Sequence, residues 1–172
     1  LKVNSNSVVF DIFFGLGYNS AAAIDTVKGP LTIYCFENDK EILSKILEMD
    51  ADFESWSIIK NFVKGFLEDD IKVYSCDGVK LIMLFGDARE KIQSVNIKAD
   101  FIFFDPFSPL KVPKLWDVDF LKDIRSKMNS KAKLSTYSCA KIVKGNFLKA
   151  GFNLEDGPIV GRDAPSTIAI NP

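Results

Sequence analysis

The fold is decided by one short stretch of the chain, Phe101-Ile102-Phe103-Phe104-Asp105-Pro106-Phe107-Ser108-Pro109. Its first four residues form an apolar run that is typical of a strand buried on both faces of a parallel sheet. In such sheets, ligands bind beyond the carboxyl ends of the strands. We therefore predict that Asp105, which ends the run, lies at a functional site. A plainer interpretation is that Asp105 only caps a helix before the proline turn.

Similar apolar runs alternate with amphipathic segments along the rest of the chain. They predict strands over residues 8–14, 31–36, 71–75, 79–84, 134–138, 152–155 and 167–170. Helices are predicted over residues 18–25, 53–68, 88–95, 116–128 and 140–148, and from Asn38 or Asp39 onward. Cys76-Asp77-Gly78, between two of the strands, is typical of a β-hairpin. The alternation predicts a single α/β domain over residues 1–172 with a mainly parallel sheet.

The composition excludes several kinds of chemistry. The 172 residues include no histidine, which removes Ser-His-Asp and Cys-His nucleophiles and histidine-ligated metal sites, so we expect no metal. Three isolated cysteines, Cys35, Cys76 and Cys139, are expected to be small buried residues in a reducing compartment, which favours the cytoplasm. No apolar run nears the roughly 18 residues that span a bilayer, and the first residues form no secretory signal. The chain begins at Leu1 rather than methionine, which leaves open whether residues precede it.

Charge is unevenly distributed along the chain. Residues 111–149 carry ten lysine and arginine residues against three aspartates, a net charge of +7, whereas the whole chain has a net charge of -1. A basic stretch of this kind can hold a polyanion such as nucleic acid. The alternative is a set of solvated helix faces.

Glycines and acidic residues follow the predicted strands. Gly15-Leu16-Gly17 joins the first strand to a helix, an arrangement that lets backbone N–H groups approach a ligand. Glu37 ends the second strand, where a carboxylate can accept hydrogen bonds from both hydroxyls of a ribose. Asp87 is again acidic and again follows a strand. Taken alone, the glycines are also what a tight turn requires, and Glu37 could be a helix cap.

Four strands thus end in or near Asp11-x-x-x-Gly15-x-Gly17, Glu37, Gly86-Asp87 and Asp105-Pro106-Phe107. With this pattern the chain resembles Rossmann-like S-adenosylmethionine-dependent methyltransferases. More closely, it is similar to the methyltransferase domains of the tRNA 5-methylaminomethyl-2-thiouridine biosynthesis bifunctional proteins and their free-standing relatives. The most specific part runs from Asp100 to Trp116, with a strand, an Asp-x-Phe-x-Pro turn, Lys-x-Pro and Trp. The resemblance implies a class I fold, with a mostly parallel seven-stranded sheet flanked by helices and an inserted β-hairpin.

The resemblance also implies roles for individual residues. Glu37 would bind the ribose hydroxyls of S-adenosyl-L-methionine, Asp87 its adenine amino group, and the Gly15–Gly17 turn its methionine part. Asp105 and Tyr137 are the expected catalytic residues, Asp105 facing the sulfonium and the nucleophile and Tyr137 bordering the substrate pocket. The residues expected to bind the cofactor are Asp11, Phe14, Gly15, Gly17, Asn19, Glu37, Asp87, Ala88, Asp105 and Pro106. Those expected to bind the substrate are Phe107, Ser108, Lys111, Tyr137 and Arg162.

The residue types fit methyl transfer to an amine. An already activated methyl group mainly requires alignment of the reacting atoms and exclusion of water. A carboxylate such as Asp105 can orient the N–H of a neutral amine and stabilise the cation that forms. The Asp-Pro-Phe turn is also similar to the Asp-Pro-Pro-aromatic motif of methyltransferases that act on exocyclic amines. Two places depart from the family: Phe13 stands where an additional glycine is usual, and residues 161–167 differ from its Gly-Arg-Lys-Arg form.

The sequence therefore predicts an S-adenosyl-L-methionine-dependent methyltransferase that N-methylates the aminomethyl group of a modified wobble uridine in tRNA. The alternatives are a methyltransferase of the same fold acting on a small molecule or protein, an aminopropyl transferase, and a catalytically lapsed nucleic-acid-binding module. The expected partner is tRNA, with no membrane. The 172 residues lack the FAD-dependent oxidase half of the bifunctional proteins, so any step that needs it requires a separate protein or a different substrate.

Overall fold

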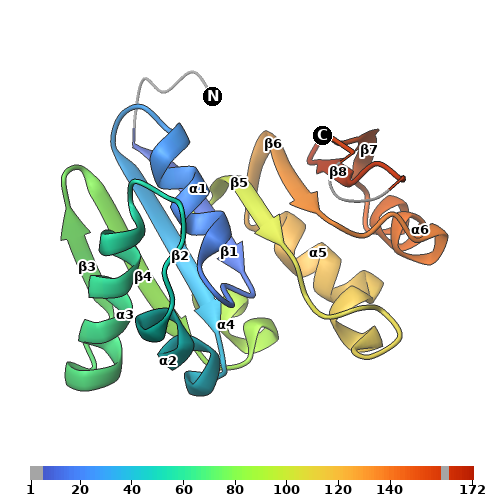
Figure 1. Ribbon diagram of the computed structural model, residues 1–172. Helices are drawn as coiled ribbons and strands as arrows, with labels where there is room; N and C mark the ends of the chain where they lie inside the picture. Colours follow the sequence, from blue (N-terminus) through green and yellow to red (C-terminus); the bar gives the residue numbers. More distant parts are fainter. Residues whose placement is uncertain (1–5, 160–162) are drawn as a thin grey trace. The chain divides into compact units, whose positions relative to one another are not determined.

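The computed structural model of the chain (Figure 1) describes residues 6–159 and 163–172. The chain divides into two units, Leu1–Lys91 and Ile92–Pro172. The described residues form eight strands, four in each unit, with helices packed against them. That residues 1–172 make up a single domain stays a prediction.

The first unit is built on three parallel strands, β1 (Ser7–Ile12), β2 (Leu31–Glu37) and β4 (Val79–Phe85). β1 and β2 are almost entirely buried, as expected of the near-continuous apolar runs of a parallel sheet. The register pairs Ile12 with Phe36 and Glu37 with Phe85. The carboxyl ends of the three strands therefore meet at one edge, and the residues that follow them gather there.

A tight hairpin joins β4 to β3 (Val73–Cys76), which pairs with it in the antiparallel direction. The two loop residues, Asp77 and Gly78, have φ angles of 49° and 82°. Two successive positive φ angles are the backbone of a type I′ turn, which the Asp-Gly pair favours. The predicted hairpin is confirmed, and β3 extends the predicted seven-stranded sheet by one strand.

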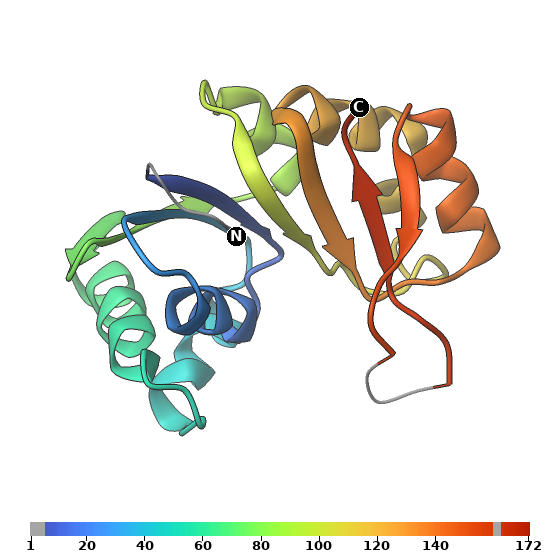
Figure 2. The same ribbon diagram turned by 90° about the horizontal axis from the view of Figure 1, so that it is seen from above.

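The helices of this part of the chain are α1 (Tyr18–Thr26), α2 (Lys40–Glu48), α3 (Trp56–Asp69) and α4 (Ala88–Ser94), the last of which crosses the boundary between the units. Asp39 caps α2, because its carboxylate accepts hydrogen bonds from the N–H groups of Glu41 and Ile42. α1, α2 and α3 lie on one face of the strands (Figure 2). α3 has an apolar stripe that is buried there and belongs to the core: Ile59, Phe62, Val63 and Phe66.

The second unit has the strand order β5-β6-β8-β7. The strands are β5 (Ala99–Phe104), β6 (Met128–Thr136), β7 (Asn153–Asp156) and β8 (Thr167–Ile170). β5 and β6 are parallel, whereas β8 pairs antiparallel with both β6 and β7, between which it lies (Figure 2). Three of the four strands thus run in one direction, and the mostly parallel sheet flanked by helices is confirmed.

One helix prediction in this unit is wrong. Residues 116–128 do not form a single helix but belong to a 3₁₀ helix η1 (Pro113–Trp116), the helix α5 (Val118–Ser126) and the beginning of β6. Asp117 starts α5 as an N-cap that accepts a hydrogen bond from the N–H of Phe120, and this separates Trp116 from the helix. Met128 continues the apolar spacing of α5 but already lies in β6, where it is buried. The last helix, α6 (Lys141–Lys149), lies with α5 on one face of the strands (Figure 2).

Burial differs from the prediction at several apolar positions. Phe101 and Phe103 in β5 are half-buried and stack edge to face on each other, so this strand is fully buried on only one face. Leu148, an apolar residue of α6, is 58% exposed. Only Cys35 of the three cysteines is buried, while Cys76 and Cys139 are half-buried. In the described part of the chain, no helix has the length and apolar character needed to cross a membrane.

Candidate active site

The turn between β1 and α1 has an unusual backbone. Phe13, Gly15 and Gly17 all have positive φ angles, of 74°, 56° and 77°. At Gly17 there is also no room for a side chain, because a Cβ atom would lie 2.9 Å from Cζ of Phe14 and 3.0 Å from Cγ2 of Ile59. α1 begins directly after Gly17 without a side-chain cap. The first N–H groups of the helix can therefore receive an anionic ligand group.

Phe13, the departure from the family pattern, lies in the left-handed region where glycine is usual. Glycine is favoured at such a position because a bulky side chain at positive φ costs about 1–2 kcal/mol. The side chain of the neighbouring Phe14 is 3% exposed and packs edge to face on Phe62. Phe14 can therefore reach a cofactor only through its backbone, whose carbonyl accepts the N–H of Gly17 at 2.9 Å.

We expect the Phe13→Gly variant to be more stable than the Phe13→Ala variant by about 1 kcal/mol, because only glycine adopts this φ without strain. At an ordinary helical position the order is reversed, and Ala22→Gly in α1 should lower the free energy of unfolding by about 1 kcal/mol. Urea unfolding of Phe13→Gly, Phe13→Ala and Ala22→Gly measures both differences. A Phe13→Ala variant as stable as Phe13→Gly would contradict the strain.

Glu37 at the end of β2 is tied to the glycine turn. Its carboxylate, 9% exposed, accepts the N–H of Gly15 at 2.8 Å on Oε2, and the N–H groups of Asn38 and Asp39 at 2.8 and 3.0 Å on Oε1. The sequence does not reveal this bond to Gly15, because it depends on how β1 and β2 lie side by side. Oε2 keeps acceptor capacity for a further donor, since a carboxylate has about four lone-pair sites.

Beneath this turn lies a buried polar cluster of Asp11, Ser20 and Cys35. The hydroxyl of Ser20 donates to Oδ2 of Asp11 at 2.7 Å, and both residues are fully buried. Burial, and secondarily the negative charge of Asp11, raises the pKa of the Cys35 thiol well above its usual value. Cys35 therefore stays a protonated thiol and acts as a small core residue. Sequence reasoning missed Ser20, whose only signal is its position in the first turn of α1.

Asp87 follows β4 and begins α4. Its Oδ1 accepts the N–H of Arg89 at 2.8 Å, so one of its oxygens caps α4. The side chain is nevertheless exposed and open to a ligand, while Ala88 beside it is buried. Gly86 has a φ of 135°, and a Cβ atom there would meet the side chain of Lys91. Asn19, in the first turn of α1, is half-buried.

In the second unit, the structure brings Asp105 and Tyr137 together at the ends of β5 and β6. Oδ1 of Asp105 accepts the backbone N–H of Tyr137 at 3.1 Å. The hydroxyl of Tyr137 donates in turn to the carbonyl of Pro106 at 3.1 Å. Tyr137 is 41% exposed and Asp105 is half-buried, so both can meet a ligand from solvent. Because β5 and β6 are parallel neighbours, their carboxyl ends lie side by side, and this brings Asp105 close to Tyr137.

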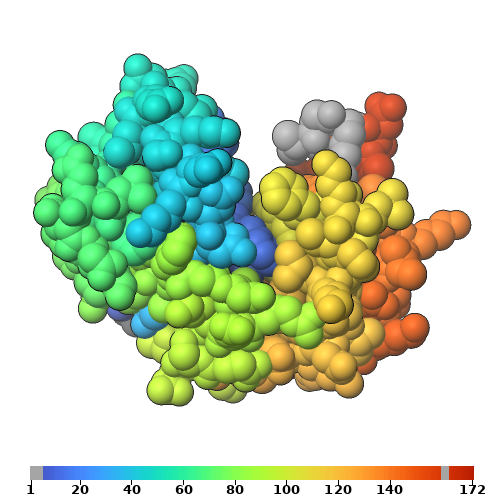
Figure 3. All heavy atoms as spheres, turned by 90° about the horizontal axis from the view of Figure 1, so that it is seen from below, coloured from blue at the N-terminus to red at the C-terminus, as the bar shows by residue number. Residues whose placement is uncertain are grey.

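The loop after β5 lies at the surface of its unit, where Figure 3 shows it in yellow. The side chains of Phe107 and Leu110 are 69% and 96% exposed. The carbonyl of Ser108 accepts the N–H of Lys111 at 2.8 Å, which turns the chain back and leaves the Lys111 side chain exposed. A surface aromatic ring such as that of Phe107 is a usual stacking partner for an unstacked base. Arg162, also expected at the substrate, lies outside the described residues.

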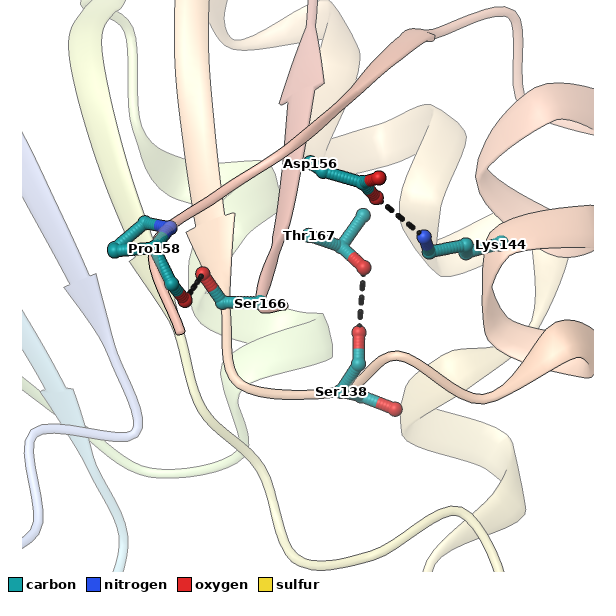
Figure 4. Close-up of polar contacts among 6 residues, drawn as sticks. All are labelled: Ser138, Lys144, Asp156, Pro158, Ser166 and Thr167. Atoms are coloured by element: carbon teal, nitrogen blue, oxygen red, sulfur yellow. Dashed lines mark hydrogen bonds and ion pairs between the residues drawn. The ribbon is translucent and has the colours of Figure 1, made fainter. Parts of the chain in front are cut away.

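The connection between β7 and β8 is closed by hydrogen bonds at its base (Figure 4). The hydroxyl of Ser166 donates to the carbonyl of Pro158 at 3.1 Å. The hydroxyl of Thr167, which is fully buried, donates to the carbonyl of Ser138 at 2.7 Å. Ser138 directly follows Tyr137. The base of the connection is therefore fixed to the backbone beside the Asp105–Tyr137 pair.

Some of the positive side chains of residues 111–149 are paired with other groups of the second unit. Lys122 pairs with Asp119, Lys133 with Glu155, and Lys144 with Asp156. Lys127 donates to the carbonyl of Val95 at 2.7 Å. The surface available to a polyanion is thus less basic than the sequence indicates. Over residues 6–159 and 163–172, no cluster of three or more cysteine or acidic side chains could hold a metal ion.

Comparison with known proteins identifies a family and several relatives of the chain. A family model described as S-adenosyl-L-methionine-dependent methyltransferase matches residues 53–172. The chain is 32% identical to an uncharacterized protein of Methanocaldococcus jannaschii, covering 96% of this chain and 46% of that protein. It is 31% identical to the tRNA 5-methylaminomethyl-2-thiouridine biosynthesis bifunctional protein MnmC of Campylobacter hominis, covering 88% of this chain and 24% of that protein.

Among solved structures, MnmC2 from Aquifex aeolicus matches with a TM-score of 0.73 and 32% identity, over 96% of this chain and 53% of that one. The chain thus spans less than half the length of these two curated relatives and about half of the solved one. The predicted Rossmann-like methyltransferase fold is confirmed by this match.

Proposed function

Since the chain belongs to the S-adenosyl-L-methionine-dependent methyltransferase family, we propose that it methylates an amine nitrogen of a modified wobble uridine in tRNA. The observation that carries the proposal is the Asp105–Tyr137 pair at two strand ends, next to the exposed ring of Phe107. The names of the MnmC relatives support the tRNA substrate. The proposal includes a cytoplasmic location and a separate protein that generates the aminomethyl group.

The residues of the first unit fit the cofactor. Bound S-adenosyl-L-methionine supplies a methyl group already activated on a sulfonium. The glycine turn offers a close backbone approach at Gly15 and Gly17, and the uncapped start of α1 suits the carboxylate of the methionine part. The carboxylate of Glu37 is held in place by three N–H groups and would accept from the ribose, while the exposed Asp87 would accept from the adenine amino group.

In the second unit, the residues act on the acceptor amine. The carboxylate of Asp105 accepts an N–H of the neutral amine, which directs the nitrogen lone pair towards the methyl carbon. As the nitrogen becomes positively charged, the same carboxylate stabilises it. Tyr137 fixes the orientation of Asp105 through its backbone N–H. Phe107 stacks on the unpaired base and Pro106 lines the site.

A smaller acceptor is the second candidate, and one observation favours it. Lys122, Lys133 and Lys144, which belong to the basic stretch of residues 111–149, are ion-paired within the unit, and this weakens the expected electrostatic attraction to a polyanion. Under this alternative, Asp105 has the same role, but the affinity for tRNA is negligible and independent of salt.

Calorimetric titration with S-adenosyl-L-methionine and with its demethylated product tests the first step. Saturable binding is expected, followed by methyl transfer from labelled cofactor to tRNA that carries the unmethylated aminomethyl uridine. The same tRNA with an unmodified wobble uridine is the matched control. Transfer to both tRNAs alike, or to neither, would contradict the proposed acceptor.

Lys111→Ala is expected to lower the affinity for tRNA several-fold and to reduce the salt slope of binding by about one phosphate contact. The reason is that Lys111 is exposed on the loop after β5, the same loop that carries Phe107. Fluorescence anisotropy at several salt concentrations gives both quantities. Lys64→Ala on α3, an exposed lysine of the first unit, serves as the control and should leave the slope unchanged. An unaltered slope in Lys111→Ala would remove this residue from the tRNA site.

A further inference from the structure

We propose that Trp116 is a positioning residue for the acceptor site, because its indole N–H holds the Asp105–Phe107 turn through the carbonyl of Phe107. The inference deepens the proposed function and rests on it, since it takes Asp105 as the group that orients the acceptor. Sequence reasoning assigned Trp116 to an amphipathic helix, and the structure separates it from that helix.

The turn is held by donors from other segments at successive positions. Tyr137 donates its backbone N–H to Asp105 and its hydroxyl to the carbonyl of Pro106, each at 3.1 Å. The indole Nε1 of Trp116 donates to the carbonyl of Phe107 at 2.8 Å. Pro106 and Pro109 have no N–H, so the turn has few backbone donors of its own. Donors from elsewhere in the unit must therefore fix its carbonyls.

Trp116 is itself held on several sides. The residue is 1% exposed, and its ring lies edge to face against Phe104 at 5.2 Å and against Tyr137 at 6.0 Å. Its carbonyl accepts from the side-chain amide of Asn146 on α6 at 2.9 Å. The indole ring is therefore fixed in position, and its N–H can bond the carbonyl of Phe107 only when the turn has the observed geometry. It touches the ring of Tyr137 and bonds Phe107, so it fixes both sides of the segment that carries Asp105.

The bond affects position more than folding. Phe107 is 69% exposed, so the turn adds little to the core, and loss of the indole N–H should free the turn more than it destabilises the unit. The turn would then sample several positions while the core remains intact. A misplacement of about 1 Å at a reacting centre can reduce the rate by about 100-fold.

The test is Trp116→Phe, which keeps an aromatic ring but removes the N–H. We expect kcat for tRNA methylation to fall about 10- to 100-fold, while the Kd for S-adenosyl-L-methionine measured by calorimetry stays within about two-fold. The matched control is Trp56→Phe. Trp56 is the other tryptophan of the chain, is 6% exposed, and also donates its indole N–H to a backbone carbonyl, that of Met49 at 3.2 Å. This control loses the same kind of bond away from the turn and should keep its kcat.

A readout that needs no catalysis separates this inference from the proposed function. Hydrogen exchange at the N–H groups of Tyr137 and Lys111, which donate to Asp105 and to the carbonyl of Ser108, should be about ten-fold faster in Trp116→Phe than in the wild type, and unchanged in Trp56→Phe. If the wild type methylates no tRNA but exchange responds this way, the proposed function fails and the positioning by Trp116 stands. If exchange at the turn is unchanged, or if both variants lose kcat in proportion to their stability, the positioning role is overturned.

Discussion

Replacing Asp105 by alanine is expected to lower kcat for methyl transfer by about 10²–10⁴-fold while the protein stays folded. The carboxylate directly follows the last residue of β5, and it is half-buried rather than part of the core. Its removal takes away the acceptor that orients the amine and the charge that stabilises the product cation. The lost hydrogen bond from the N–H of Tyr137 should lower the free energy of unfolding by about 1–3 kcal/mol, because its acceptor is charged.

Asp105→Asn separates the two roles of the side chain. The amide oxygen can still accept the N–H of Tyr137 and orient the amine, but it lacks the negative charge that stabilises the product cation. We expect a rate between those of the wild type and the alanine variant. Asp100→Asn is the matched control: Asp100 lies near the opposite end of the same strand, and its Oδ1 accepts from the side-chain amide of Asn129 at 2.8 Å. Single-turnover rates with saturating cofactor give the comparison. Activity in Asp105→Ala equal to that of Asp100→Asn would exclude Asp105 from catalysis.

The strand ends could be predicted from sequence because they depend on local signals. The run from Phe101 to Phe104 is apolar and stops at an aspartate and a proline, and the parallel pairing of β5 and β6 follows from the alternation of strands and helices. The hairpin at Asp77-Gly78 could be predicted for the same reason, since its two positive φ angles are a property of those two residues.

What could not be predicted depends on packing between segments far apart in the sequence. The bond from Trp116 to Phe107 requires that the helix begin after Trp116. The regular apolar spacing from Trp116 to Met128 instead predicts one continuous helix. Leu148 fits the apolar spacing of α6 as well as Phe147 does, yet only Phe147 faces the core. The positive φ of Phe13 could not be predicted either, because phenylalanine has no preference for the left-handed backbone conformation.

Glu37→Ala is expected to weaken the binding of S-adenosyl-L-methionine about 10- to 100-fold, equivalent to roughly 1–3 kcal/mol for lost hydrogen bonds to a charged group. Two effects contribute. The ribose loses its acceptor, and the glycine turn loses the bond that joins the N–H of Gly15 to β2 at 2.8 Å. We therefore also expect the free energy of unfolding to fall by about 1–3 kcal/mol, because the N–H groups of Asn38 and Asp39 lose the same acceptor.

The two effects can be separated with Asp39→Ala. Asp39 follows Glu37 by two residues, and its carboxylate also accepts two backbone N–H groups, those of Glu41 and Ile42, but none from the glycine turn. Its loss should reduce stability by about 1 kcal/mol, as for other N-caps, and leave the cofactor Kd unchanged. Calorimetric titration and urea unfolding of both variants give a Kd and a free energy for each. A cofactor Kd that rises equally in both variants would mean that Glu37 acts only by stabilising the start of α2. A rise confined to Glu37→Ala assigns the effect to the ribose and the Gly15 turn.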